Sequence, residues 1–314
     1  MNLNAISTRE MSRAEWLEER TKGIGGSDAG IILGLNKYRT AFELWLEKTG
    51  QVTPQEIDNE AIYWGNEMEN VVAKEFEKRT DKKVRRSNFM YSHPEYPFIK
   101  ANVDRLVVGE SAVLECKTAS AYLAKEWEAD EVPDTYLVQV QHYMGVTGKE
   151  KGYIAVLIGG NRFVWKEVER DEELINMIFE AEKHFWKYHV LQGNPPVLDG
   201  SSAAEKYLKE KYDRAEKDKE IILSSDYKDL LSQYEKIKAD EKLIKAAKTE
   251  IENKVKAELK DAETGIIDRF QVSWKNQSRT SVDTTALKQK FPDIYREVLK
   301  ETSFRKFAVK EFDN

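Results

Sequence analysis

Three residues near the middle of the chain have the types and spacing of a divalent-cation site. Asp104 lies in NVDRLVV, and Glu115 and Lys117 follow in LECK. Hard cations such as Mg²⁺ prefer carboxylate oxygens, and such an ion can activate water and neutralise charge on a scissile phosphate. A nearby ammonium can orient the attacking water or stabilise the transition state. An aspartate followed by Glu-x-Lys is common by chance, however, and an exposed hairpin with alternating charges is the alternative.

The segments around these residues read as two short strands joined by Gly109-Glu110. Glycine at the first central position is typical of a two-residue type II′ hairpin loop. This loop places Leu106 opposite Val113 and, further along, Asp104 opposite Glu115, with Cβ atoms about 4.5 to 5.5 Å apart. Two carboxylates at this distance repel one another unless a cation or a proton lies between them.

Lys117 adds an amine to the same face, because side chains two positions apart in a strand project to the same side as each other. The helix expected at about residues 60–79 contributes a third acid. Its apolar stripe passes through Glu69, so this carboxylate points inward, whereas Glu67 and Glu75 do not. An inward carboxylate is costly unless it meets a cation, which makes Glu69 a candidate for the same site.

A second helix, TYLVQVQHYMGVTG, presents polar groups on one face. Tyr136, Gln139 and Tyr143 lie at positions i, i+3 and i+7, so they share that face and could reach a phosphate. The alternative is an aromatic helix surface packed on the sheet. For Tyr143 we favour that packing role.

The octet GIGGSDAG, residues 23–30, could bind an anion. It matches neither the P-loop nor the dinucleotide-binding glycine pattern. It leads into a helix, DAGIILG, that Ser27-Asp28 would cap, and a helix N-terminus directs free N–H groups and a positive dipole at a phosphate. The alternative is that Gly25 and Gly26 only allow a tight turn and that Ser27 is only an N-cap.

Composition limits the class of protein. The 314 residues carry a net charge of −6, so any affinity for nucleic acid must come from a local basic surface. One candidate is the run Lys82, Lys83, Arg85 and Arg86, although a solvated strand end explains it equally well. The single cysteine, Cys116, excludes an internal disulfide and a four-cysteine metal site. No apolar run has the length of a membrane span and MNLNAISTREMSRAEW lacks a signal-peptide layout, so we expect a cytoplasmic protein without membrane association.

The elements that must position these residues fall into two domains. Residues 1–198 read as an α+β core with the helices SRAEWLEER, FELWLEKTG, 60–79, TYLVQVQHYMGVTG and 171–191, and the strands FIKANVDRLVV, SAVLECKT, GYIAVLIGG and FVWKEVER. Residues 199–314 read as a helical arm with a terminal strand-helix-strand unit (IIDRFQVSW, TTALKQKFPDIYREVLK, FRKFAV).

In the arm, apolar residues recur at a spacing of seven, at Leu230, Ile237, Ile244 and Ile251. Glu241 and Lys248 interrupt the neighbouring positions, which argues against a long coiled coil. The pattern favours a helical hairpin packed along one stripe.

Taken in order, ERTKGIGGSDAG, WGNEMEN, NVD, LECK and YLVQVQHYMGVTG resemble the YqaJ-type viral recombinases, relatives of lambda exonuclease in the PD-(D/E)xK nuclease superfamily. The resemblance covers about residues 10–190 and implies a central mixed sheet flanked by helices. It implies metal binding by Asp104, Glu115 and the backbone carbonyl of Cys116, catalytic roles for Lys117, Gln139 and Glu69, and DNA contact by Arg20, Ser27 and Tyr136. Arg20 and Ser27 match the spacing of the arginine and serine with which the family grips a terminal 5′-phosphate.

The resemblance also implies an activity. The family uses Mg²⁺, expected here as two ions with Mn²⁺ as a substitute, to degrade one strand of linear duplex DNA in the 5′→3′ direction. The remaining 3′ strand would pass to a RecT-like single-strand annealing protein in a bacterial host, as in phage or prophage recombination. A homo-oligomer is expected, and the family's best-known member forms a trimeric ring. The rival hypothesis is a catalytically idle nuclease-like module that binds DNA and recruits a partner, although the intact Asp104, Glu115 and Lys117 set argues against idleness.

Overall fold

The structure is a computed structural model that describes residues 4–52, 60–128, 131–300 and 304–310. The chain divides into two units, Met1–Tyr207 and Leu208–Asn314. The sequence-based boundary at residue 198 lies before helix α7 (Ser202–Lys211), whose first turns belong to the first unit. They do so because the Tyr207 ring packs 5.4 Å from the Phe42 ring and 5.8 Å from the Trp45 ring.

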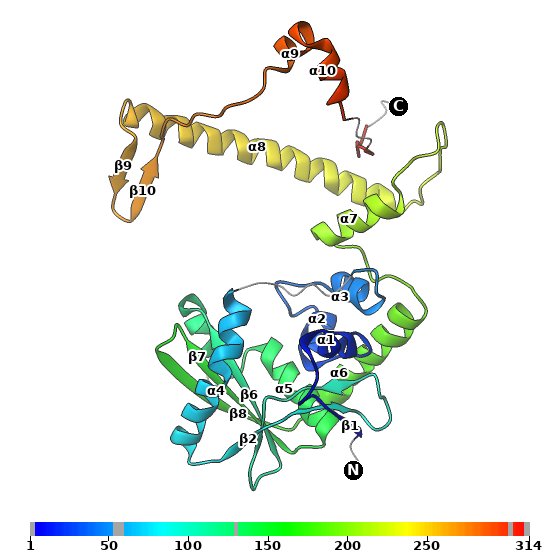
Figure 1. Ribbon diagram of the computed structural model, residues 1–314, viewed down its shortest axis with the longest axis vertical. Coiled ribbons are helices and arrows are strands. Elements are labelled where there is room, and N and C mark those ends of the chain that lie inside the picture. Colours follow the sequence, from blue (N-terminus) through cyan, green and yellow to red (C-terminus); the bar gives the residue numbers. More distant parts are fainter. Residues whose placement is uncertain (1–3, 53–59, 129–130, 301–303, 311–314) are drawn as a thin grey trace. The chain divides into compact units, whose positions relative to one another are not determined.

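A five-stranded mixed sheet forms the centre of the first unit (Figure 1). Its strands, in spatial order, are β2 (Val84–Arg86), β5 (Arg105–Val107), β6 (Ala112–Ala119), β7 (Lys151–Ile158) and β8 (Arg162–Glu169). Strands β6 and β7 run parallel and the other neighbours antiparallel. The predicted hairpin register is confirmed, since Leu106 pairs with Val113 and Gly109 has a φ of 83°.

Helices cover both faces of this sheet, which confirms the expected α+β core with flanking helices. Alternate residues of β7 separate the two faces. Tyr153 and Ala155 pack in a cluster with Phe76 of α4 (Glu60–Thr80). Ile154 and Val156 pack on the other face with residues of α5 (Asp134–Thr147) and α6 (Glu172–His184). Because the central parallel strands are buried on both sides, charged side chains on β6 need partners within the protein.

The first unit is completed by three short helices and a small sheet. Helix α1 (Arg13–Thr21) starts with a capping box of Ser12 and Glu15, and α2 (Gly26–Ile32) and α3 (Ala41–Lys48) follow. Strands β1 (Asn4–Ser7), β3 (Phe89–Ser92) and β4 (Lys100–Ala101) form a separate three-stranded sheet. A 3₁₀ segment, η1 (Ala121–Trp127), follows β6, and α6 continues as a π-helical segment, η2 (Phe185–Leu191).

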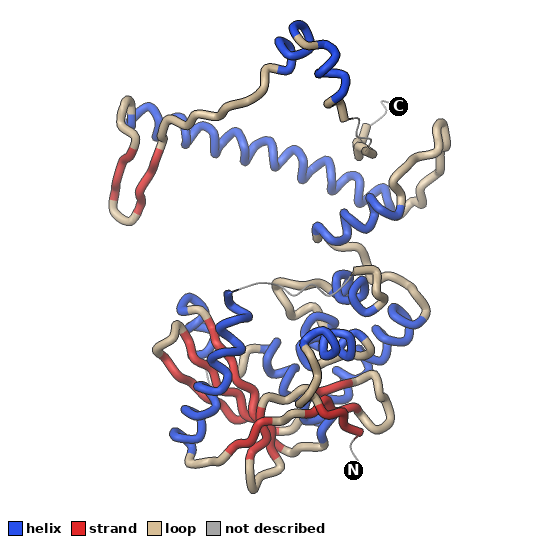
Figure 2. The backbone as a smooth tube through the Cα atoms, in the orientation of Figure 1, coloured by secondary structure: helices blue, strands red, loops and turns tan. Residues whose placement is uncertain are grey.

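In the second unit, the predicted helical hairpin is wrong. Residues 227–259 form one continuous helix, α8 (Tyr227–Leu259), as Figure 2 shows. The predicted strand IIDRFQVSW is instead a two-stranded hairpin, β9 (Thr264–Ile267) and β10 (Phe270–Ser273), which turns at Asp268 with a φ of 46°.

The end of the second unit also differs from the expectation. The predicted helix TTALKQKFPDIYREVLK is divided into α9 (Thr284–Lys290) and α10 (Pro292–Glu297), because Pro292 cannot donate an N–H within a helix but suits a first helical position. The predicted strand FRKFAV, residues 304–309, is not a strand in the structure. Within the described ranges, no helix is both long and apolar enough to cross a membrane.

Candidate active site

The two predicted acids and the lysine meet on the α5 side of the central sheet. Asp104 immediately precedes β5, and its Oδ2 accepts a hydrogen bond from the backbone N–H of Cys116 at 2.8 Å. Glu115 on β6 is only 3% exposed, and its Oε1 lies 2.5 Å from the Nζ of Lys117. The hairpin thus brings together the three residues that the register predicted on one face.

Gln139 links this cluster to α5. Its Nε2 donates to Oε1 of Glu115 and to the hydroxyl of Tyr143, each at 2.8 Å. Tyr136, one turn earlier on α5, stacks on the Trp127 ring, and the Nζ of Lys117 lies 5.6 Å from the centre of the Tyr136 ring. Spacing along α5 therefore predicted correctly which polar groups share the face toward β6.

The acids leave negative charge that the described residues do not fully balance. Oε2 of Glu115 is buried and has no hydrogen-bond partner among the residues that the structure describes. Burial raises the pKa of the Asp104 carboxyl well above its ordinary value, and the Glu115 and Glu69 carboxylates raise it further, while Lys117 only partly opposes them. A divalent cation would supply the missing charge, so the donor set fits one.

Lys117 remains an ammonium ion in this setting. Burial would lower its pKa, but the Glu115 and Asp104 carboxylates outweigh burial and raise the pKa above its ordinary value. The side chain is 24% exposed, so the ammonium can still reach a bound molecule. Its chemistry is that of a hydrogen-bond donor and a fixed positive charge, since it holds its proton too tightly to act as a base at neutral pH.

Sequence reasoning missed Arg105, which is the ion-pair partner of Glu69. The Glu69 carboxylate and the Arg105 guanidinium pair on the α4 side of the sheet, where Arg105 is 4% exposed. The alternation in VDRLVV could have indicated the side on which Arg105 lies, because it puts Arg105 on the face opposite Asp104.

Among the described residues, no group of three or more His, Cys, Asp or Glu side chains is arranged to hold a metal ion. A catalytic role for Glu69 stays a prediction, beside the observed role of neutralising Arg105.

Cys116 contributes to the cluster through its backbone. Burial, followed by the Asp104 and Glu115 carboxylates, raises the pKa of its thiol well above the ordinary value, so the thiol stays neutral. The backbone N–H holds Asp104 in place. Metal coordination by the Cys116 carbonyl stays a prediction.

The basic run on the edge strand β2 is partly neutralised. Lys82 pairs with Glu110 at 2.5 Å, and Arg86 lies 3.9 Å from Oε1 of Glu69. Lys83 and Arg85 are exposed. A role for this run in binding nucleic acid stays a prediction.

The octet GIGGSDAG forms the start of helix α2, and the Asp28 carboxylate within the octet binds one of the backbone amides there. Helix α2 begins at Gly26 with Gly25 as N-cap, so the predicted capping role of Ser27 is wrong. Asp28 bonds back to the N–H of Gly25 at 3.0 Å, which takes one of the amides expected to be free for an anion. Gly26 is required by packing, because a Cβ there would lie 2.5 Å from the Tyr143 ring.

Ser27 is exposed and faces Arg20. The Nη2 of Arg20 donates to the Ser27 hydroxyl at 2.9 Å, which brings together the two residues matched to a 5′-phosphate grip. Buried Lys48, which sequence reasoning missed, holds this corner: its Nζ lies 2.8 Å from Oδ2 of Asp28 and donates to the Arg20 carbonyl at 2.8 Å. Burial would raise the pKa of Asp28, but Lys48 and Arg20 lower it below the ordinary value.

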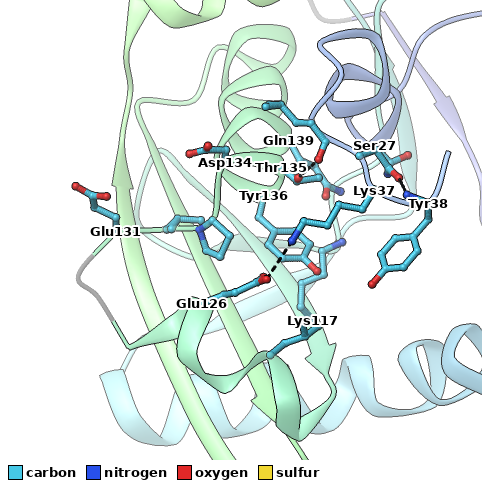
Figure 3. Close-up of a pocket in the computed structure, with 15 residues that line it drawn as sticks. Ser27, Lys37, Tyr38, Lys117, Glu126, Glu131, Asp134, Thr135, Tyr136 and Gln139 are labelled. Carbon is cyan, nitrogen blue, oxygen red and sulfur yellow. Dashed lines mark hydrogen bonds and ion pairs between the residues drawn. The ribbon is translucent and has the colours of Figure 1, made fainter. Parts of the chain in front are cut away.

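A pocket of about 570 Å³ joins these two sets of residues (Figure 3). Ser27, Lys117, Tyr136 and Gln139 all contribute to its wall, so four of the predicted site residues converge from α2, β6 and α5. Lys37 and Glu126 form an ion pair of 3.2 Å on the same wall. The volume lies in the range of small-molecule sites, and the donors on its wall suit a phosphorylated ligand.

Comparison with known proteins gives several matches. The chain matches the YqaJ-like viral recombinase domain over residues 15–150. It is 58% identical over 304 residues to the uncharacterized protein YqaJ of Bacillus subtilis (strain 168), a match that covers 96% of this chain and 95% of that protein.

Among solved structures, the chain is similar to an alkaline exonuclease (LHK-Exo) from Laribacter hongkongensis, with 21% identity and a TM-score of 0.49 over 63% of this chain and 96% of that one. It is also similar to a phage-related exonuclease from Haemophilus somnus 129PT, with 17% identity and a TM-score of 0.46 over 54% of this chain and 94% of that one.

Proposed function

The chain belongs to the family of YqaJ-like viral recombinase proteins, and on this basis we propose that it is a metal-dependent exonuclease that acts on the ends of duplex DNA. The proposal specifies Mg²⁺, 5′→3′ degradation of one strand, and a 3′ single strand as the product. A single-strand annealing protein of the RecT-like type would then bind that product.

One observation supports the proposal most strongly. Asp104 and Glu115 are held close together in a buried place, with one carboxylate oxygen of Glu115 unpartnered among the described residues and the pKa of Asp104 raised. Holding two acids in this way costs stability unless a cation binds there. An idle scaffold has no use for that cost, which disfavours the rival hypothesis.

Asp104 and Glu115 would hold the ion. A bound Mg²⁺ supplies Lewis-acid activation of water and neutralises charge on the scissile phosphate. Gln139 fixes the orientation of Glu115 through the hydrogen bond of 2.8 Å. Lys117, a permanent ammonium beside Glu115, stabilises negative charge that develops on the phosphate.

We expect the full-length protein to release nucleotides from linear duplex DNA in the presence of Mg²⁺ and to stop when EDTA is added. Labels placed separately on each 5′ and 3′ end report the polarity, and a covalently closed circle of the same sequence is the control for a requirement for ends. Binding of linear duplex without any metal-dependent release would support the idle-module hypothesis instead.

We further propose that Arg20 and Ser27 bind the terminal 5′-phosphate. Their side chains already meet at 2.9 Å, and Ser27 is on the wall of the pocket that also contains Lys117. The guanidinium offers paired donors for phosphate oxygens. Since Asp28 occupies the Gly25 amide, the grip depends on these two side chains more than on the start of α2.

Duplex ends with a 5′-phosphate should therefore be degraded about a hundredfold faster than ends with a 5′-hydroxyl, because gripping the end positions the first scissile bond. Arg20→Ala should slow phosphorylated ends toward the hydroxyl rate and leave hydroxyl ends nearly unchanged. Arg13→Ala is the matched control, because both arginines stack on the Trp16 ring but Ser27 is hydrogen-bonded to Arg20.

Steady-state rates on the two kinds of end decide the matter. An equal slowing of both ends in Arg20→Ala would make Arg20 a general backbone contact, because a lost cation weakens affinity for both substrates alike. Equal rates on both ends in the parent protein would remove the phosphate grip.

A further inference from the structure

Helix α8 carries an exposed apolar stripe. Leu230, Ile237, Ile244 and Ile251 recur every seven residues, and each is between 56% and 69% exposed. In the described part of the chain, α8 contains no buried residue. A helix surrounded by water gains nothing from large aliphatic side chains in register, so the stripe indicates a contact surface.

The positions beside this stripe complete a two-helix seam. Tyr234, Glu241, Lys248 and Val255 alternate with the aliphatic residues at spacings of three and four, as knobs-into-holes packing requires. Two of the four are charged, with opposite signs. Within the described ranges Glu241 has no ion-pair partner, and Lys248 lies 3.8 Å from Glu252. The positions of Glu241 and Lys248 therefore determine whether a parallel or an antiparallel partner helix is favoured.

A parallel partner of the same sequence does not fit. In register, it would set Glu241 against Glu241 of the second copy and Lys248 against Lys248 of the second copy. Like charges at such central positions repel each other. A parallel seam would thus be weakest in its middle.

An antiparallel partner resolves both charges. In one register, Lys248 lies beside Ile244 of the second copy, and Glu241 lies beside Ile251 of the second copy. These two contacts follow one another along the helix pair, so Glu241 of each helix comes within reach of Lys248 of the other. Because the contact is two-fold symmetric, the attraction occurs twice.

The flanking positions agree with this register. It brings Lys238 near Glu252 of the second copy and Asp240 near Lys254 of the second copy, and each pair again occurs twice. At the centre of the contact, Ala247 lies opposite Ala247 of the second copy, where neither side chain is charged. Lys245 lies opposite Lys245 of the second copy, and this is the one like-charged contact among these flanking pairs.

From this complementarity we propose that α8 pairs antiparallel with α8 of a second copy of the chain. The seam extends from Ile237, which lies opposite Val255 of the second copy, to Val255. The contact joins two nuclease units through their arms and is independent of the proposed catalytic function. It gives the expected homo-oligomer one specific two-fold interface.

Sedimentation of the full-length protein tests the proposal. The parent protein should dimerise, and Ile244→Asp should abolish dimerisation through this surface without unfolding the chain, because Ile244 is 69% exposed. Glu241→Lys and Lys248→Glu should each raise the dimer dissociation constant about tenfold or more, and an equimolar mixture of the two variants should restore association. Lys242→Glu, an equal change of charge outside the seam, should leave the dimer dissociation constant unchanged.

Engineered cysteines report the orientation. Ala247→Cys should form a disulfide-linked dimer on mild oxidation, whereas Ala246→Cys, one position around the helix, should not. The native Cys116 is buried and does not interfere. A parent protein that stays monomeric, an assembly that Ile244→Asp leaves intact, or single charge variants that associate as well as the parent would each overturn the proposal.

Discussion

We expect the Asp104→Asn variant to lose Mg²⁺-dependent cleavage of linear duplex DNA by more than about a hundredfold. Replacing groups that only support metal ligands typically costs about 10- to 100-fold, so the loss of a ligand should cost more. Asparagine keeps the shape of the side chain and can still accept the hydrogen bond from Cys116 N–H, which is 2.8 Å long in the parent protein. The loss should therefore reflect the missing charge and leave the hairpin intact.

The same variant should be as stable as the parent protein, or more stable, in the absence of metal. The pKa of Asp104 is raised in the folded protein, mainly by burial and by Glu115. A carboxyl with a raised folded-state pKa gives its full stability below the unfolded pKa, and this stability is lost as the pH rises through the folded value. The metal-free parent should thus lose stability over that interval, while Asp104→Asn should lose less.

Thermal unfolding with and without Mg²⁺ separates metal binding from catalysis. An ion at a hundred times its dissociation constant stabilises the folded state by about 2.7 kcal/mol. The parent protein should show such a shift at pH values where Asp104 is ionised, and Asp104→Asn should show little of it. Asp81→Asn, at an exposed aspartate that follows α4, is the control. Retention of near-normal cleavage by Asp104→Asn would remove this residue from the site.

The parts of the site that the sequence predicted are those set by local geometry. A glycine loop and the two-residue period of a strand determine which side chains oppose each other, and these two rules are enough to place Asp104, Glu115 and Lys117 together. Helical spacing does the same for Tyr136 and Gln139 on α5. These relations depend on residues close together in the chain.

The parts that the sequence did not predict are pairings between distant segments. Arg105 neutralises Glu69 from another element, and Lys48 of α3 neutralises Asp28 of α2. Periodicity can place Arg105 on the face of its strand opposite Asp104, but it identifies neither ion pair, because burial of a charge reveals that a partner is needed and not where that partner lies. The Ser27 cap failed for a related reason, since Asp28 competes for the same helix start and takes the Gly25 amide.

The arm shows a different limit. A seven-residue apolar repeat predicts that a helix has a partner along one stripe, but it does not say whether that partner is the next helix or another chain. The hairpin interpretation assumed the first. Helix α8 continues without a break to Leu259, and its described surroundings leave Ile237, Ile244 and Ile251 exposed.

We expect Lys117→Met to lower the turnover number by about a hundredfold to a thousandfold while binding of duplex ends changes only a few fold. The ammonium stabilises charge that develops in the transition state, and such groups affect turnover more than affinity. Single-turnover cleavage at saturating enzyme measures the chemical step, and an end-binding assay in Ca²⁺ measures affinity. Weaker binding with unchanged turnover at saturation would show that Lys117 is a DNA contact.

Stability gives Lys117 a second, independent signature, because replacing it should change the free energy of unfolding near neutral pH in the direction opposite to that of Asp104→Asn. Its folded-state pKa is raised by Glu115 and Asp104, so its contribution is fully present below the unfolded lysine pKa and is lost as the pH rises through the folded value. Lys117→Met should therefore destabilise the metal-free protein near neutral pH, because two close acids lose their cation. Adding Asp104→Asn to Lys117→Met should recover part of that loss, since residues in one ion-pair cluster are not additive. Additive effects of the two substitutions on the free energy of unfolding would show that the side chains do not interact, and the shared metal site would lose its physical basis.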